Sequence, residues 1–110
     1  MPSLDLRKHR KSYLKLTLPD EEETKLSVMQ PTKELFGKMT DMSANIGTMT
    51  GSDYTALDEV YEVCAELISR NKEGVYMTRA QLEELLDFED IVVLLRTYSE
   101  FVASIMSEKN

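Results

Sequence analysis

The 110-residue chain has little of what builds catalytic or cross-linked sites: one cysteine (Cys64), one histidine (His9) and no tryptophan. A single cysteine excludes a disulfide within the chain, which is typical of proteins from a reducing compartment. Because Cys64 and His9 lie far apart in the sequence, they cannot form a zinc site or a cysteine–histidine nucleophile pair within one chain. We expect His9 to be solvated and Cys64 to be a buried structural thiol. The sequence therefore predicts no cofactor and no enzymatic activity.

Glycine and long apolar runs are also scarce. Four scattered glycines form no glycine-rich phosphate loop. The longest apolar run, residues 91–95, is far shorter than a membrane span. The first eleven residues, MPSLDLRKHRK, carry charge without an apolar segment behind them, unlike a signal peptide. We expect no membrane partner and a cytoplasmic location.

Charge is unevenly distributed along the chain. The net charge is −7, yet residues 1–15 carry five basic residues against one Asp, a net +4, so the remaining chain carries −11. An acidic body repels phosphate backbones, so nucleic acid is not an expected partner. Residues 1–11 show no hydrophobic periodicity. We therefore predict a flexible basic tail at 1–11, a single globular domain at 12–107 and a short C-terminal tail at 108–110.

Two short stretches alternate between apolar and polar residues, as half-buried strands do. In residues 13–18 the leucines alternate with Lys15 and Thr17, and in residues 24–29 Leu26 and Val28 alternate with Lys25 and Ser27. Pro19-Asp20 begins a polar turn between them. The pattern predicts an antiparallel hairpin, which is too small to be stable alone. Its leucine face must pack on helices or on another chain.

Helical periodicity follows the hairpin. Thr32 is a predicted helix cap, and residues 45–52 (NIGTMTGS) are expected to end that helix in a flexible loop. A second helix is predicted after a Thr55 cap, and Asn71 to Gly74 should stop it, with Gly74 suited to a left-handed conformation. A short helix is predicted to begin with a capping box of Thr78 and Gln81. A long helix from about Phe88 to Met106 completes the chain; Val102 belongs to its apolar stripe, which Val92 and Val93 widen. The predicted fold class is α+β, mainly α, with an N-terminal β-hairpin followed by three or four helices in a small bundle. The long last helix is expected to be the most buried.

Two groups of polar residues contain side chains of the kind found in catalytic or metal sites. The carboxylates between Glu83 and Asp90 fall on polar helix faces or at a helix start, where solvation and the helix dipole account for them. Residues 69–74 resemble the beginning of a calcium loop, but Ala80 occupies the position of the essential bidentate glutamate. We therefore predict neither a catalytic acid pair nor a metal site.

Apolar side chains on the hairpin and the first helix are the best candidates for a partner surface. Seven methionines serve either as core filler or as an adaptable surface for hydrophobic partners. The hairpin leucines could equally form the core of the domain itself, and so could the first helix. The candidate partner-binding residues are Leu14, Leu16, Leu18, Leu26, Val28, Phe36, Met39 and Met42. The edge of the hairpin could also pair with another copy, giving a homo-oligomer.

The order of elements resembles the small tail assembly chaperones of long-tailed bacteriophages and prophages. The resemblance covers residues 12–106 and is carried by KSYLKLTLPD…TKLSVMQPTKELF and by ALDEVYEVCAELISRNKEGVYMTRAQLEELLDFEDIVVLLRTYSEFV. Its strongest parts are Gln30-Pro31-Thr32-Lys33, Arg70-Asn71 and residues 84–87. The turn departs from the expected Pro-Asp-Gly, since this chain has Pro-Asp-Glu-Glu-Glu.

The resemblance implies a chaperone that binds the tape measure protein, keeps it soluble and helps recruit tail tube subunits. It further implies a location in the host cytoplasm and absence from the mature virion. A small regulatory or adaptor protein whose basic head contacts nucleic acid is one alternative, and retention on heparin at low salt would favour it. A structural tail or connector component is another, and presence in purified particles would favour that.

Overall fold

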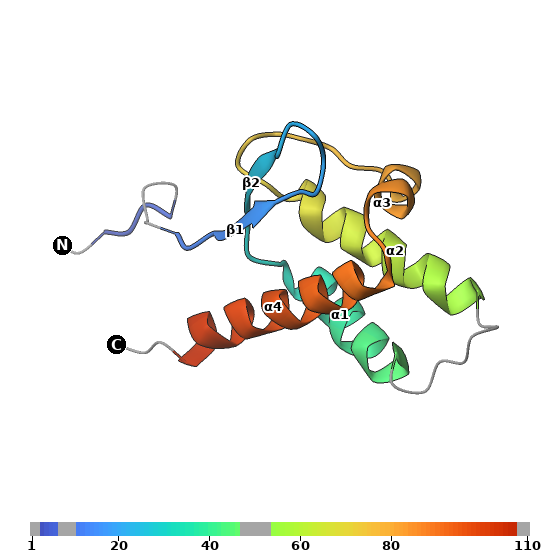
Figure 1. The fold of residues 1–110 in the computed structure, drawn as a ribbon. Helices are drawn as coiled ribbons and strands as arrows, with labels where there is room; N and C mark the ends of the chain where they lie inside the picture. The colour runs from blue at the N-terminus through green and yellow to red at the C-terminus, as the bar shows by residue number, and fades with distance from the viewer. Residues whose placement is uncertain (1–2, 7–10, 47–53, 108–110) are drawn as a thin grey trace.

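The computed structural model describes residues 3–6, 11–46 and 54–107; for residues 43–46 and 54–56 it describes the helical backbone only. Within this part of the chain a two-stranded antiparallel hairpin precedes four helices (Figure 1). The elements are β1 (Leu14–Thr17), β2 (Lys25–Val28), α1 (Lys33–Ile46), α2 (Tyr54–Ser69), α3 (Arg79–Leu85) and α4 (Phe88–Ser107). The predicted fold class is confirmed.

The hairpin joins the two predicted strands in antiparallel orientation. Leu14 pairs with Val28, and Leu16 pairs with Leu26. In the turn, the Asp20 carboxylate accepts hydrogen bonds from the backbone N–H of Thr24 (2.8 Å) and from its hydroxyl (2.6 Å). These bonds stabilise the ionised carboxylate and lower the pKa of Asp20. Glu23 takes the left-handed conformation (φ 51°) that a glycine would favour, and the bonds between Asp20 and Thr24 hold the turn.

The strand β2 is covered along its outer edge as well as on its leucine face. The chain that leaves α2 runs antiparallel to it, and Val28 bridges to Asn71. The backbone N–H of Met29 donates to the carbonyl of Arg70 (2.7 Å), and that of Lys72 donates to the carbonyl of Ser27 (2.9 Å). The alternating pattern predicted Ser27 on the solvent side, but the residue is buried. This neighbouring segment, which the periodicity of β2 alone does not reveal, explains the difference.

Asn71 holds the turn that follows α2. Its side-chain amide donates to the carbonyls of Ile68 (2.8 Å) and Val75 (2.7 Å), and its side-chain oxygen accepts from the N–H of Val75 (2.8 Å). Gly74 has a φ of 75°, the left-handed conformation expected at this position. The side chain of Asn71 therefore replaces the hydrogen bonds that the helix loses where it ends.

Hydrogen bonds from Arg70 and from Tyr98 hold the junction between β2 and α1. The Arg70 guanidinium donates to the carbonyl of Gln30 through Nε (3.1 Å) and Nη2 (2.9 Å). The hydroxyl of Tyr98, on α4, donates to the carbonyl of Met29 (2.9 Å). Burial raises the pKa of Tyr98 to about 12, so the phenol remains a donor at physiological pH. These bonds fix the direction in which α1 leaves the hairpin.

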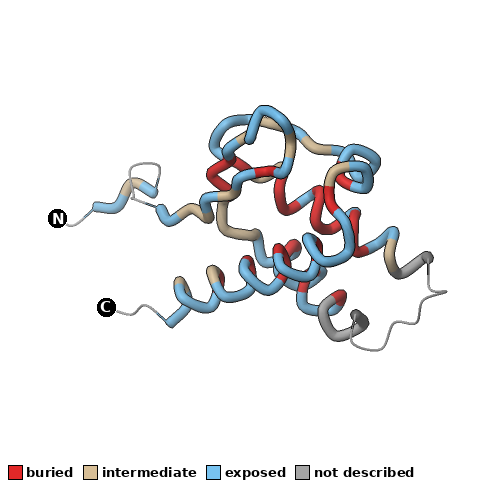
Figure 2. Tube along the Cα trace, in the orientation of Figure 1, coloured by how far each residue is buried: buried red, intermediate tan, exposed pale blue. Residues whose placement is uncertain are grey.

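Helix α2 is the centre of the domain. It packs against α1, α3, α4 and β2, and most of its residues between Val60 and Ile68 are buried (Figure 2). The expectation that the last helix is the most buried is wrong. On α4, Val92 and Val93 are 48% and 45% exposed, because the helix is covered on one side only.

Side-chain caps begin three of the helices. The hydroxyl of Thr32 accepts from the N–H of Leu35 at the start of α1, and Thr78 and Gln81 form the predicted capping box of α3. Asp87 and Asp90 exchange a similar pair of bonds at the start of α4. Helix α2 begins at Tyr54, one residue before the predicted Thr55 cap.

Some predictions concern residues outside the described part of the chain. These are the body of the basic tail with His9, the centre of the predicted loop at 45–52, and the tail at 108–110. Among the described residues, no helix combines the length and apolar character that a membrane crossing requires.

We expect Asn71→Ala to lower the free energy of unfolding by roughly 2 to 4 kcal/mol. The variant loses three hydrogen bonds and leaves the carbonyls of Ile68 and Val75 without this partner. Urea unfolding followed by circular dichroism measures the change. Arg96→Ala, a truncation at an exposed position of α4, is the control and should change stability by less than about 0.5 kcal/mol. Equal effects of the two variants would contradict this role of Asn71.

A second prediction concerns acid stability. The Glu73 carboxylate accepts from the N–H of Ser27 (2.7 Å), and this bond lowers the pKa of Glu73 from its ordinary 4.5. A carboxyl with a lowered folded-state pKa stabilises the fold above its unfolded-state pKa and loses that effect as pH falls. The stability difference between the wild type and Glu73→Gln should therefore shrink as pH falls below 4.5. Urea unfolding at a series of pH values measures it; a difference that grows toward acid would contradict the interaction.

Candidate functional site

Helix α4 has an apolar groove on each flank, because the other elements cover only one of its sides. The first, the α1/α4 groove, has a volume of about 240 Å³. It is lined by Phe36, Met39 and Thr40 of α1 and by Ser99, Val102, Ala103 and Met106 of α4. The α1 residues follow i, i+3, i+4 spacing and those of α4 follow i, i+3, i+4, i+7, so each helix presents one continuous face to the groove.

The α1/α4 groove combines a buried floor with an exposed apolar rim. Met39 and Val102 are buried in the core, whereas Phe36 is 36% exposed and Met106 is 68% exposed. Three of the lining side chains are small (Thr40, Ser99 and Ala103), so the backbone of a bound partner can approach the two helices closely. A hollow between two helices, lined by flexible and small side chains, is the kind of surface that accepts one apolar face of an amphipathic helix.

The second hollow, the β1/α4 groove, lies on the other flank of the helix and has a volume of about 280 Å³. Residues 14–19 form one wall and α4 forms the opposite wall, with Val93 and Leu94 among its residues. Ile68 and Leu86 also line it. The two grooves share α4 but have no lining residue in common.

The structure divides the eight predicted partner-binding residues into core and surface. Five of them pack within the domain's own core: Leu18, Leu26, Val28, Met39 and Met42. Leu14 and Leu16 are half-buried and line the β1/α4 groove, and Phe36 stands at the rim of the α1/α4 groove. Five of the eight residues are therefore core residues, as the alternative interpretation holds. The other three are partly exposed and can contact a partner.

Sequence reasoning missed the α4 half of the α1/α4 groove. Ser99, Val102, Ala103 and Met106 were not among the predicted partner-binding residues. The spacing places Val102 in the apolar stripe of the last helix, and Met106 falls one turn after it on the same face. The signal was the continuation of this stripe by an exposed methionine, but the sequence does not show that α1 lies beside it.

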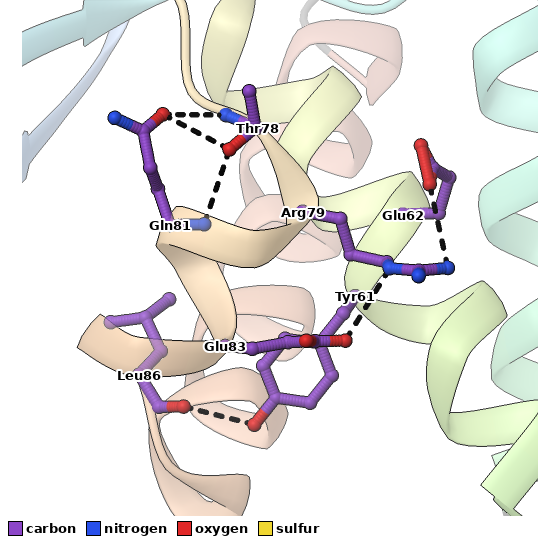
Figure 3. A network of polar contacts seen from close by, with 7 residues as sticks. All are labelled: Tyr61, Glu62, Thr78, Arg79, Gln81, Glu83 and Leu86. Carbon is purple, nitrogen blue, oxygen red and sulfur yellow. Dashed lines mark hydrogen bonds and ion pairs between the residues drawn. The ribbon is translucent and has the colours of Figure 1, made fainter.

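Glu62 on α2 and Glu83 on α3 lie on the surface and form exposed ion pairs. Arg79 lies between Glu62 (3.8 Å) and Glu83 (3.4 Å), as Figure 3 shows together with the capping box of Thr78 and Gln81. Exposed pairs of this kind contribute little to stability, because water and salt screen them. A hollow of about 570 Å³ beside this network is lined mainly by polar and small side chains. It lacks the apolar walls of the two α4 grooves.

Tyr61 is the buried member of the same region. Its hydroxyl donates to the carbonyl of Leu86 (2.9 Å), which ties α2 to the link between α3 and α4 (Figure 3). Desolvation and the nearby acidic side chains, first among them Asp87, raise the pKa of Tyr61. The phenol therefore acts as a structural donor.

The residues considered for chemistry have structural contacts. Cys64 is fully buried, and desolvation raises the pKa of its thiol to about 12, which suppresses the reactive thiolate. The three residues aligned with calcium ligands are used within the fold: Ser69 binds the backbone of Met77, Asn71 holds its own turn, and Glu73 binds Ser27. Among the described residues, no group of three or more His, Cys, Asp or Glu is placed to hold a metal ion.

Two of the sequence motifs that carry the family resemblance meet in space. Arg70-Asn71 contacts Gln30 and the end of β2, as described above. Both motifs therefore have a structural role in this fold. Comparison with protein-family models, with curated proteins and with solved structures found no match to this chain.

Proposed function

We propose that this protein is a non-catalytic binding protein whose α1/α4 groove takes the apolar face of a helix from another protein. The observation that carries the proposal is the open groove between two helices, with Phe36 and Met106 exposed on its rim above a buried apolar floor. Large apolar side chains exposed beside one another typically mark a contact surface for another protein. Methionine and small residues permit the groove to adapt to partners of differing sequence.

The partner we propose is the tape measure protein of a long-tailed phage, on the basis of the family resemblance. A very long helical protein exposes apolar stripes that would aggregate if they stayed uncovered. Many copies of a small domain with an apolar groove could cover such stripes, and weak affinity for each copy would suffice. The acidic outer surface, which includes Glu62 and Glu83, would keep the coated complex in solution through like-charge repulsion.

The remaining parts of the proposal rest on the resemblance alone. The protein would help to recruit tail tube subunits around the tape measure protein, act in the host cytoplasm and be absent from the finished virion. If it were instead found in purified particles, a structural tail component would be the better interpretation.

The test is a binding measurement with the double variant Phe36→Asp, Met106→Asp. Met106 is 68% exposed and Phe36 is 36% exposed, and neither belongs to the buried core, so the variant should still fold, which circular dichroism and urea unfolding check. Affinity for an amphipathic helical peptide of the tape measure protein, measured by fluorescence anisotropy, should fall by at least roughly tenfold because desolvated apolar contacts are replaced by charge. Co-expression with the variant should also leave the tape measure protein insoluble.

A matched control separates this effect from a general loss of surface hydrophobicity. Tyr76→Asp replaces another highly exposed apolar side chain, which lies outside both α4 grooves. It should bind the peptide like the wild type. Unchanged binding by the double variant, or equal losses in the double variant and in Tyr76→Asp, would overturn the assignment of the α1/α4 groove.

A further inference from the structure

The outer edge of β1 has backbone groups that no element of the hairpin uses. On β2, the backbone of Ser27 and Met29 bonds to the Arg70–Lys72 segment, so the groups of Leu26 and Val28 point toward β1. In an antiparallel ladder these directions alternate along each strand. The register therefore turns the N–H and C=O groups of Lys15 and Thr17 away from β2.

This edge borders the β1/α4 groove. Six successive residues, 14–19, line one wall of the groove, so the hollow follows the strand along its length. On the opposite wall, Val93 lines the groove and is nevertheless 45% exposed. A strand added to the edge of β1 would place alternate side chains on the leucine face of the hairpin, above this wall.

Among the described residues, no segment forms hydrogen bonds with the outer edge of β1 as the Arg70–Lys72 segment does with β2. Proteins often protect an edge strand with a lysine or with a covering segment. The Arg70–Glu73 segment covers β2. The one lysine of β1, Lys15, donates to the hydroxyl of Ser27 (2.9 Å), which holds its side chain over the neighbouring strand. The edge is thus open to a further strand.

The chain itself contains a segment with the pattern that this edge requires. Leu4 and Leu6 alternate with Asp5, and their side chains are 77% and 65% exposed. Figure 1 shows this segment leading away from the domain, and it contributes no side chain to the groove of its own copy. The basic residues Arg7 to Lys11 follow it in the sequence, whereas Asp90 lines the groove and Asp87 and Glu89 are exposed beside it at the start of α4. The sequence after the segment is therefore opposite in charge to the start of α4, and the leucines of the segment match the apolar lining of the groove.

We propose that residues 3–6 of one copy add as a strand to the outer edge of β1 in a second copy, with Leu4 and Leu6 packed into the β1/α4 groove. Reciprocal exchange closes a two-fold dimer, and one-way exchange gives an open chain of copies. The inference stands apart from the proposed function, since self-association uses the opposite flank of α4 from the helix-binding groove.

The first experiment is disulfide trapping between two single variants of the full chain, Leu6→Cys and Val93→Cys. Under mild oxidation a mixture of the two should give a covalent dimer containing one chain of each. The native Cys64 is buried with a pKa of about 12 and does not compete. Leu6→Cys mixed with Tyr76→Cys, an exposed position outside the groove, should give no more dimer than chance collision. Adding Leu4→Ser to the Leu6→Cys chain should reduce the trapped dimer.

The second experiment is sedimentation of the wild type and of the double variant Leu4→Ser, Leu6→Ser. Both leucines are exposed, so the variant keeps the stability of a single copy. The wild type should sediment as two or more chains, and the variant as one chain. The association of the wild type should weaken at high salt.

A wild type that stays monomeric would overturn the proposal. A variant that carries both Leu6→Cys and Val93→Cys should form disulfides between chains. If it formed them only within a single chain, the proposal would be overturned too. Loss of self-association with intact peptide binding would leave the α1/α4 groove assignment standing.

Discussion

The pairing of β2 with the chain that leaves α2 is the contact on which the rest of this domain depends. A two-stranded hairpin buries too little to be stable in water by itself. Here the Arg70–Glu73 segment supplies backbone partners for Ser27 and Met29, so the hairpin becomes part of the helical core. The same segment holds the β2–α1 junction through the Arg70 guanidinium, and Asn71 closes its own turn from within. A few polar side chains thus determine how the β and α parts of the molecule are joined.

This arrangement places α2 at the centre and leaves α4 at the periphery. Because α4 is covered on one side only, the apolar residues at its margins line open grooves toward α1 and toward β1. The two grooves offer different kinds of recognition. The α1/α4 groove has side-chain walls suited to a helix, whereas the β1/α4 groove is bordered by a strand edge with free backbone groups. The two proposed contacts use separate surfaces, so self-association and the binding of a helix would not compete for the same residues.

Local sequence patterns predicted the elements well and their mutual arrangement poorly. The alternation of Leu14 and Leu16, the capping box of Thr78 and Gln81 and the left-handed Gly74 are local properties, and the structure confirms each of them. Ser27 is buried and Val93 is exposed, the opposite of what their periodicity predicted, because both depend on segments that are distant in the sequence. For the same reason most of the predicted contact residues lie in the core, and half of the α1/α4 groove was missed. An apolar face can be predicted from its spacing, but what covers it depends on the packing of distant elements.

Residue-resolved amide hydrogen exchange at low protein concentration is the most direct test of the pairing between β2 and the Arg70–Glu73 segment. The amides of Met29 and Lys72 donate across this pairing, at 2.7 and 2.9 Å, and we expect them to exchange slowly, in step with global unfolding. The amides of Lys15 and Thr17, on the open edge of β1, should exchange much faster in the same sample. If Met29 and Lys72 exchanged as fast as Lys15 and Thr17, the segment would not be paired with β2, and the proposed basis of the fold would be contradicted.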